Sequence, residues 1–250
     1  MTQPITLYSH ITGPNPWKVS IILEELKIPY TTKFLDFSDL KKEPYETLNP
    51  NGRVPAITDP NTSLTLWESG AIIEYLIDTY DQTTQLSYPS SPERYHTKQW
   101  LHFQMSGQGP YFGQAHWFTK MHSEKVDSVI DRFLTQIKRV LYVLDRHLKG
   151  KEWLVGDKCT YADLSFVMWN EGIPWIFGDR AGELEMEKDY PNFFAWHTRL
   201  MERPAVKRSL RIRRLLRVVN CRFEGMKDPW LVTLTSHILD FNRMFDSVEY

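Results

Sequence analysis

The chain has 250 residues, 42% hydrophobic and 14% aromatic, with a formal net charge of −1 at neutral pH. This length is enough for one large domain or two smaller ones, and the charge gives no general attraction to nucleic acid or anionic membranes. The two cysteines, Cys159 and Cys221, have no CxxC or metal-ligand spacing, so we expect neither a disulfide framework nor a metal site. No secretory signal and no apolar run of about 20 residues is visible, so we expect a cytoplasmic protein without a membrane span.

The first part of the chain predicts two strands joined by a helix. Residues 5–9 alternate and are β-prone, which predicts a first strand. Asn15 is placed to cap a helix with Pro16 as its first residue, and Pro29 ends that helix. Four apolar residues share one face of the helix: Val19, Ile22, Leu23 and Leu26. Residues 30–37 predict a second strand, parallel to the first because a helix connects them.

The stretch from Asn49 to Gly70 has the features of a ligand site. Asn51-Gly52 marks a turn, and Pro55 enters a strand where only an edge or a corner tolerates it. Val54 could offer its backbone to an extended peptide. Two short strands follow, and Ser69 then opens a helix whose free N–H groups favour a carboxylate. This pattern predicts a site for a small anionic peptide.

A polar, proline-bearing segment at residues 81–93 predicts a domain boundary, and helical patterns dominate beyond it. The clearest is an apolar stripe formed by Ile130, Phe133, Leu134, Ile137, Leu141, Leu144 and Leu148. Gly150 is expected to end that helix.

Thr160 and Asp163 are spaced as a capping box at the start of an aromatic-rich helix, for which we predict a structural role. Further helices are expected at about 192–201 and from Pro204 onward. Six basic residues near the end of the last helix are interpreted as a solvated face: Lys207, Arg208, Arg211, Arg213, Arg214 and Arg217. For the segment 218–250 the sequence indicates no definite structure.

The order strand–helix–strand, loop, strand–strand–helix is the thioredoxin-like arrangement. Val54-Pro55, a strand pair and then Glu68-Ser69-Gly70 resemble the glutathione site of cytosolic glutathione transferases. The resemblance runs over about residues 5–217. It implies an α/β thioredoxin-like domain at 1–86, an all-α domain with the electrophile pocket at 93–217, and an extension at 218–250.

Two further motifs resemble one branch of that family. Ser9-His10 with Pro14-Asn15 and Lys18, together with the segment 99–116, is similar to the Nu class and to the transferase-like domain of the fungal prion-forming nitrogen regulator. Those relatives typically have Asn-Gly where this chain has Asn15-Pro16. Pro16 removes one backbone donor from the place where the glutathione sulfur is expected.

Activation of glutathione needs a donor near its sulfur, because a free thiol has a pKa of about 8.5. The resemblance makes Asn15 the first candidate, although its amide could serve only as a helix cap. Ser9 and Tyr8 are alternatives, since other transferase classes use a hydroxyl near the end of the first strand. Both could instead be ordinary strand residues.

The resemblance also assigns the binding groups. Glu68 would hold the γ-glutamyl ammonium and Ser69 its carboxylate, and Val54 before a cis Pro55 would pair with the cysteinyl backbone. The alternative for the first two is a plain helix cap, and for Val54 an ordinary strand residue.

Three basic residues could reach other parts of glutathione. Arg53 or Lys42 could pair with the glycyl carboxylate, and Arg132 aligns with an arginine that reaches glutathione, in some cases across a dimer. Each could equally be a solvated side chain. Four residues could line the electrophile pocket or belong to the core: Phe103, Phe112, His116 and Trp117.

The leading hypothesis is a homodimeric enzyme that conjugates glutathione to a small hydrophobic electrophile, or reduces disulfides or organic peroxides through the glutathione thiolate. Without a CxxC pair, glutathione itself must carry the electrons. The resemblance suggests fungal detoxification or secondary metabolism. The alternative is a non-catalytic glutathione-binding regulator on the same fold, since fold alone does not determine function.

Overall fold

The computed structural model describes residues 2–223 of the chain. Its first part contains a four-stranded sheet in the order β2-β1-β3-β4. Strand β1 pairs parallel with β2 on one side and antiparallel with β3 on the other. The last pair, β3 and β4, is antiparallel. The strands are β1 (Ile5–Ser9), β2 (Tyr30–Phe34), β3 (Ala56–Asp59) and β4 (Leu64–Trp67).

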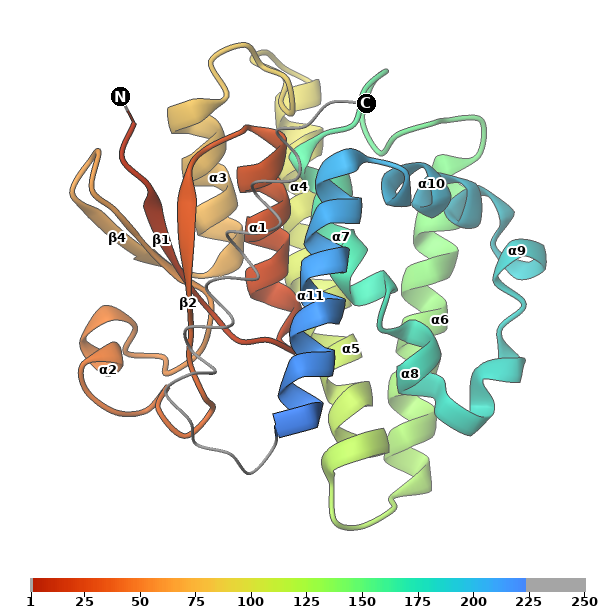
Figure 1. The fold of residues 1–250 in the computed structure, drawn as a ribbon. Helices are drawn as coiled ribbons and strands as arrows, with labels where there is room; N and C mark the ends of the chain where they lie inside the picture. Colours follow the sequence, from red (N-terminus) through yellow and green to blue (C-terminus); the bar gives the residue numbers. More distant parts are fainter. Residues whose placement is uncertain (1, 224–250) are drawn as a thin grey trace.

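Three helices accompany the sheet: α1 (Pro14–Glu25), α2 (Tyr45–Leu48) and α3 (Ser69–Tyr80). Helix α1 connects the parallel strands β1 and β2, as expected, and it lies beside α3 against the sheet (Figure 1). The element order and the mixed sheet confirm the thioredoxin-like fold of this part. Strand β2 ends at Phe34, three residues before the predicted limit.

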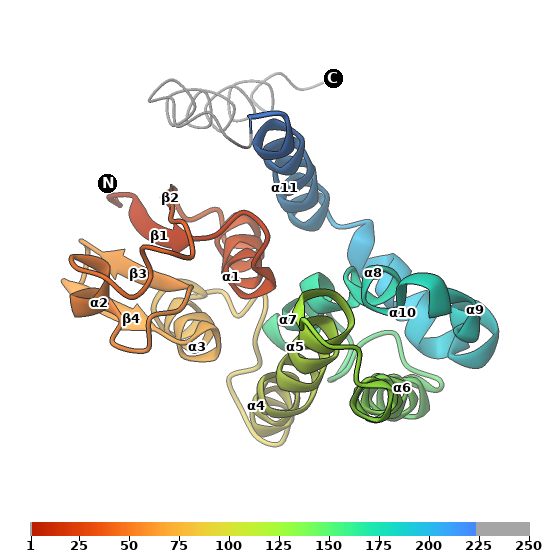
Figure 2. The ribbon, with the colours of Figure 1, turned by 90° about the horizontal axis from the view of Figure 1, so that it is seen from below.

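The rest of the described chain is helical. It contains α4 (Glu93–Phe103), η1 (Gln104–Gln108), α5 (Gly109–His116), η2 (Trp117–Met121), α6 (Asp127–Leu148), α7 (Tyr161–Asn170), α8 (Ile173–Phe177), η3 (Gly178–Glu183), α9 (Met186–Asp189), α10 (Pro191–Met201) and α11 (Pro204–Phe223). The segments η1 and η2 are π-helical turns. Helix α11 returns to lie along α1, so the last described helix meets the first (Figures 1 and 2).

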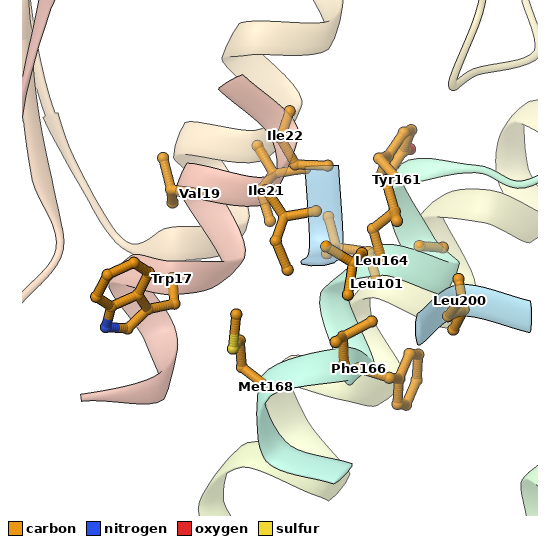
Figure 3. Packing of buried hydrophobic residues seen from close by; sticks show 14 of the residues in the cluster. Trp17, Val19, Ile21, Ile22, Leu101, Tyr161, Leu164, Phe166, Met168 and Leu200 are labelled. Atoms are coloured by element: carbon orange, nitrogen blue, oxygen red, sulfur yellow. The ribbon is translucent and has the colours of Figure 1, made fainter. Parts of the chain in front are cut away.

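Helix α1 is buried on more than the single face that the sequence predicts. Every residue from 16 to 23 is buried. The reason is its position between the sheet and helices α7 and α11 (Figure 2). Figure 3 shows Trp17, Ile21 and Ile22 of this helix close to residues of the helical part, including Leu101, Leu164 and Met168. The two parts of the chain therefore share one hydrophobic core.

The prediction that Asn15 caps α1 is wrong. The helix begins at Pro14, with Gly13 at the N-cap position and no side-chain cap. Proline suits the first helical position, because its φ is already helical and its missing N–H would have no helical partner there. Asn15 therefore lies inside the first turn, and its side chain is available for another role.

The predicted solvated face of α11 is only partly correct. Arg213 is buried, and Arg208 is half-buried and forms an ion pair with Glu24 of α1. The other basic residues of the cluster are exposed. The correction follows from the packing of α11 on α1. Helix α11 continues to Phe223, and the rest of the predicted extension, residues 224–250, lies outside the described residues.

Helix α6 confirms the predicted apolar stripe: six of its seven members are buried, and Phe133 is partly buried. Gly150 has φ +73°, the left-handed conformation expected just after a helix end. Within residues 2–223 no helix combines the length and apolarity needed to cross a membrane.

The capping box at the start of α7 is also confirmed. One oxygen of Asp163 accepts from the backbone N–H of Thr160 at 2.9 Å and from its hydroxyl at 2.8 Å. The other accepts from the Leu154 N–H at 2.9 Å and from the Trp196 indole at 2.8 Å. Asp163 is fully buried, so it ties α7, α10 and a loop together.

We therefore expect Asp163→Ala to lower the free energy of unfolding by about 3–5 kcal/mol, because it leaves several buried donors unpaired. Denaturant unfolding followed by circular dichroism measures this. The control, Glu124→Ala at an exposed loop position, should stay within about 0.5 kcal/mol of the parent. Equal midpoints for Asp163→Ala and the control would contradict the structural role.

Candidate functional site

The corner at residues 53–55 has the form expected for binding an extended peptide. The Val54–Pro55 bond is cis, as the resemblance implied. The carbonyl of Arg53 accepts from the Tyr45 hydroxyl at 2.6 Å and from the Asn49 amide at 2.5 Å. Within residues 2–223 no hydrogen bond is found to the backbone of Val54. Its N–H and C=O can therefore pair with the backbone of a ligand.

The turn before this corner requires glycine. Gly52 has φ +60°, and an added Cβ would lie 3.1 Å from the Leu40 carbonyl oxygen and 2.9 Å from Lys41 Cγ. The Gly52 N–H donates to the Asn49 carbonyl at 2.9 Å, which closes the turn. Asn49 thus holds both the turn and the carbonyl next to Val54.

The start of α3 provides two adjacent polar groups. Glu68 has φ 71° and ψ 115°, a conformation that non-glycine residues rarely adopt, and its side chain is exposed. Ser69 is buried at the first helical position. The first helical hydrogen bond joins the Ile72 N–H to the Glu68 carbonyl, so the preceding N–H groups have no helical partner. The pair can hold an ammonium beside a carboxylate.

The first turn of α1 presents Asn15. Its Oδ1 accepts from the indole Nε1 of Trp169 on α7 at 3.1 Å. Among the described residues no hydrogen bond is found from Asn15 Nδ2, so the amide directs a donor elsewhere. Pro14 and Pro16 have no N–H, which leaves the backbone of Asn15 and Trp17 as donors in this turn. The Asn15 side-chain amide is therefore one of the few donors that this turn can offer an anion.

The hydroxyl candidates on β1 are placed differently. Ser9 is buried, and its Oγ lies 3.5 Å from the carbonyl of His10. It lines a small interior hollow together with Trp17, Ser20 and Thr32. The ring of Tyr8 lies 5.7 Å from that of Tyr45. These positions favour packing roles for both residues.

The basic candidates are exposed. Lys42 forms an exposed ion pair with Asp39 at 3.5 Å, and the Arg53 side chain is exposed beside the corner. Arg132 is exposed on α6, which lies on the side of the helical part away from the sheet (Figures 1 and 2). Within residues 2–223 no hydrogen bond or ion pair is found from the Arg132 side chain to the residue 53–55 corner or to the start of α3, and its role stays a prediction for a dimer.

The pocket candidates separate into two groups. Phe112 is fully buried and meets Trp169 edge-on at 6.4 Å, so it supports the site from the core and does not line a pocket. Phe103 is partly buried against the core. Trp117 is 50% exposed, and His116 lies 4.4 Å from the exposed ring of Trp175. Burial lowers the pKa of His116, which favours its neutral form. The exposed aromatic rings remain available to an apolar molecule.

Lys18 belongs to the motif of the first loop, and the motif predicts no separate role for it. Its Nζ is buried inside the shared core, where it donates to Gln104 Oε1 at 2.8 Å and to Met105 Sδ at 3.4 Å. Burial lowers its pKa to about 7, although Glu68 acts in the opposite direction. The signal for this residue is a lysine within the largely apolar run from Pro16 to Leu23.

Residues 2–223 contain no cluster of three or more His, Cys, Asp or Glu side chains that could hold an ion. The cis-proline corner, the Glu68-Ser69 helix start and the mixed sheet are instead the features of the glutathione transferase fold. Family models agree: "Glutathione S-transferase, N-terminal domain" matches residues 3–78, and the corresponding C-terminal domain matches residues 110–204.

This chain belongs to the glutathione S-transferase family. It is 49% identical to the glutathione S-transferase-like protein OpS6 of Beauveria bassiana, over 82% of this chain and 94% of that one. It is 46% identical to glutathione S-transferase 2 of Schizosaccharomyces pombe, over 81% and 93%. The structure of the glutathione transferase URE2P8 from Phanerochaete chrysosporium with oxidized glutathione superimposes with a TM-score of 0.82 at 39% identity, over 87% of this chain and 98% of that one.

The unusual backbone of Glu68 leads to a test that separates strain from binding. Glu68→Gly should raise the free energy of unfolding by about 0.5–1 kcal/mol and weaken glutathione binding about tenfold or more, because the ammonium loses its carboxylate partner. Glu68→Gln, which keeps the strain, should lose affinity without gaining stability. Calorimetric titration and denaturant unfolding measure the two effects.

Ser63 provides the matched control, because it also has positive φ, 59°, in the turn between β3 and β4. Ser63→Gly should gain similar stability and bind glutathione like the parent. Unchanged affinity in both Glu68 variants would show that this carboxylate does not hold the ligand.

Proposed function

We propose that this protein is a glutathione-dependent enzyme that stabilises the thiolate of glutathione and delivers it to a second substrate. In this proposal the cysteinyl backbone pairs with Val54 beside Pro55. Glu68 holds the γ-glutamyl ammonium, and Ser69 with the free N–H groups of α3 holds the carboxylate. These assignments are supported by the unpaired backbone of Val54 and by the helix start at Ser69.

The observation that carries the catalytic part is the hydrogen bond from Trp169 to Asn15. An amide has one acceptor end and one donor end, and Trp169 occupies the acceptor. The Nδ2 donor is therefore free to bind an anionic sulfur. Because α7 fixes the indole, the donor is oriented before glutathione arrives, which is the condition for effective stabilisation of a developing anion.

The thiolate could react in two ways. Attack on an electrophilic carbon forms a thioether and expels the leaving group. Attack on a disulfide sulfur forms a mixed disulfide and releases a thiolate, and a second glutathione then gives oxidised glutathione and the second thiol. Burial raises the pKa of the Cys159 thiol, which disfavours it as a nucleophile and supports glutathione as the electron source. The complex of URE2P8 with oxidized glutathione favours the disulfide reaction as the first to assay.

The second substrate is proposed to be a small hydrophobic electrophile or a disulfide, with an organic peroxide as a further substrate. Trp117 and His116 with Trp175 offer exposed apolar surface for it. Arg53 or Lys42 would bind the glycyl carboxylate, and Arg132 would contribute across a homodimer. A role in fungal detoxification or secondary metabolism, in the cytoplasm, belongs to the same proposal and rests on the family resemblance alone.

Asn15→Ala tests the assignment of the donor. It should lower kcat/KM about 10–100-fold with either a disulfide or an electrophile, because the thiolate loses its side-chain donor. The Kd of S-methylglutathione, which has no ionisable thiol, should change less than about threefold. Trp169→Phe, which leaves the donor in place but no longer oriented, should lie between the parent and Asn15→Ala.

Ser9→Ala is the matched comparison on β1 and should keep parental turnover, since the Ser9 hydroxyl faces an interior hollow. If Ser9→Ala loses turnover and Asn15→Ala keeps it, the donor is Ser9. If the parent binds glutathione but turns over no disulfide, peroxide or electrophile above background, the enzymatic proposal fails and the non-catalytic binding protein is favoured.

A further inference from the structure

Lys18 is an unusual residue for its place. It lies on α1 in the middle of the shared core, 1% exposed, and it donates to Gln104 and Met105 of η1. A buried ammonium is costly unless a nearby negative charge compensates it. Its position next to the Ser69 end of the site indicates a use for this charge.

We propose that Lys18 is the buried counter-charge for the γ-glutamyl carboxylate, and that it takes up a proton when glutathione binds. The inference rests on the proposed function, because it needs a carboxylate at Ser69. In this proposal Lys18 is a positioning residue. It lies beneath the binding surface, and the sulfur of Met105 lies between it and Ser69.

The geometry places Lys18 close to that carboxylate position. Lys18 Nζ lies 3.4 Å from Met105 Sδ, and Ser69 Oγ lies 3.7 Å from the same sulfur. The two polar atoms are therefore separated by no more than the sum of these distances. Met105 also packs on the first turn of α3, since a Cβ on Gly70 would lie 3.2 Å from Met105 Cγ. A charge at this separation acts strongly through a core that contains little water.

Lys18 is held from the other side by a directed chain of amides. Gln104 receives the ammonium on its oxygen and donates from Nε2 to Gln108 at 3.0 Å, and Gln108 donates to Asn170 at 2.7 Å. The chain continues from Asn170 to His197 at 3.5 Å, and His197 lies 3.5 Å from Glu171. Each amide oxygen in this chain accepts a hydrogen bond from the side chain before it, beginning with Lys18. The chain therefore orients the Lys18 ammonium but gives it no negatively charged partner.

Among the charged groups near Lys18, one carboxylate stabilises its protonated form. Glu68, before α3, is that group, and it is exposed and assigned to the ligand's ammonium. From η1 the facing groups are the neutral Gln104 and Met105. The charged and titratable groups on the other packed elements have partners of their own: Glu24 and Glu25 with Arg208 and Arg203, Asp163 with its four donors, and Arg213 with the carbonyl of Thr12.

The proton uptake of Lys18 on binding is expected to depend on pH. Burial lowers the pKa of Lys18 to about 7 in the free protein, and a bound carboxylate nearby raises it. Below pH 7 Lys18 is charged in both states and takes up no proton. Above pH 7, up to the raised pKa, binding takes up a proton, so affinity falls by up to about tenfold per pH unit.

The test is calorimetric titration with S-methylglutathione, whose blocked sulfur removes the thiol from the proton balance. Titrations at pH 6.0 and 7.5, each in two buffers of different ionisation enthalpy, count the protons taken up. For the parent we expect almost none at pH 6.0 and more than about half a proton at pH 7.5, beyond what the ligand's own titrated amino group accounts for.

Lys18→Met has a similar volume and cannot be charged. It should abolish the additional uptake, weaken binding at pH 6.0 about tenfold or more, and make the affinity nearly equal at the two pH values. Lys98→Met is the control: Lys98 pairs with Glu74 at 3.0 Å near the surface, and its removal should leave the proton uptake unchanged.

The outcomes separate the two proposals. Binding of S-methylglutathione without the additional proton at pH 7.5 in the parent overturns the role of Lys18 and leaves the proposed function intact, even if Lys18→Met does not fold. Equal proton uptake in a folded Lys18→Met also overturns it. Absence of binding at every pH overturns both proposals.

Discussion

Burial of α1 on nearly all sides is the constraint from which the site follows. The helix packs between the sheet and helices α7 and α11, so the two parts of the chain form one core (Figures 2 and 3). Its first turn is thereby held against Trp169 of α7, and Lys18 one turn later against η1. Neither contact exists within either part alone. The Asn15 and Lys18 side of the candidate site thus depends on the packing of the helical part on the sheet, whereas the Val54 corner and the Glu68-Ser69 helix start lie within the thioredoxin-like part.

The site gathers local features that cost stability. Glu68 has positive φ, Lys18 is a buried amine, and η1 interrupts regular α-helical hydrogen bonding between α4 and α5. Such exceptions concentrate where geometry serves binding or catalysis, because selection for packing alone removes them. Each lies at or near the start of α3, and Met105 contacts both Lys18 and Ser69. Met105 and the π turn around it therefore lie against the start of α3, at the proposed position of the γ-glutamyl end.

Much of this could be predicted from local sequence, but the limits are specific. The Asn-Gly turn, the Ser69 helix start and the Thr160–Asp163 capping box depend on neighbouring residues, and all three are present in the structure. The role of Asn15 as a cap was wrong, because Pro14 takes the first helical position. The buried state of Arg213 was missed, since a helix pattern does not show which neighbour covers a basic residue.

By itself the sequence determined the order of strands and helices, the family resemblance and the residues of the peptide corner, because these depend on turn chemistry and periodicity within short stretches. Only the tertiary structure decided which way the Asn15 amide points, that Phe112 is core, and that Lys18 lies behind Ser69. Those facts depend on contacts between residues distant in the chain, such as Lys18 with Gln104, 86 positions apart, and Asn15 with Trp169, 154 positions apart. No local pattern encodes such contacts, because they arise only when elements distant in the chain pack into one core.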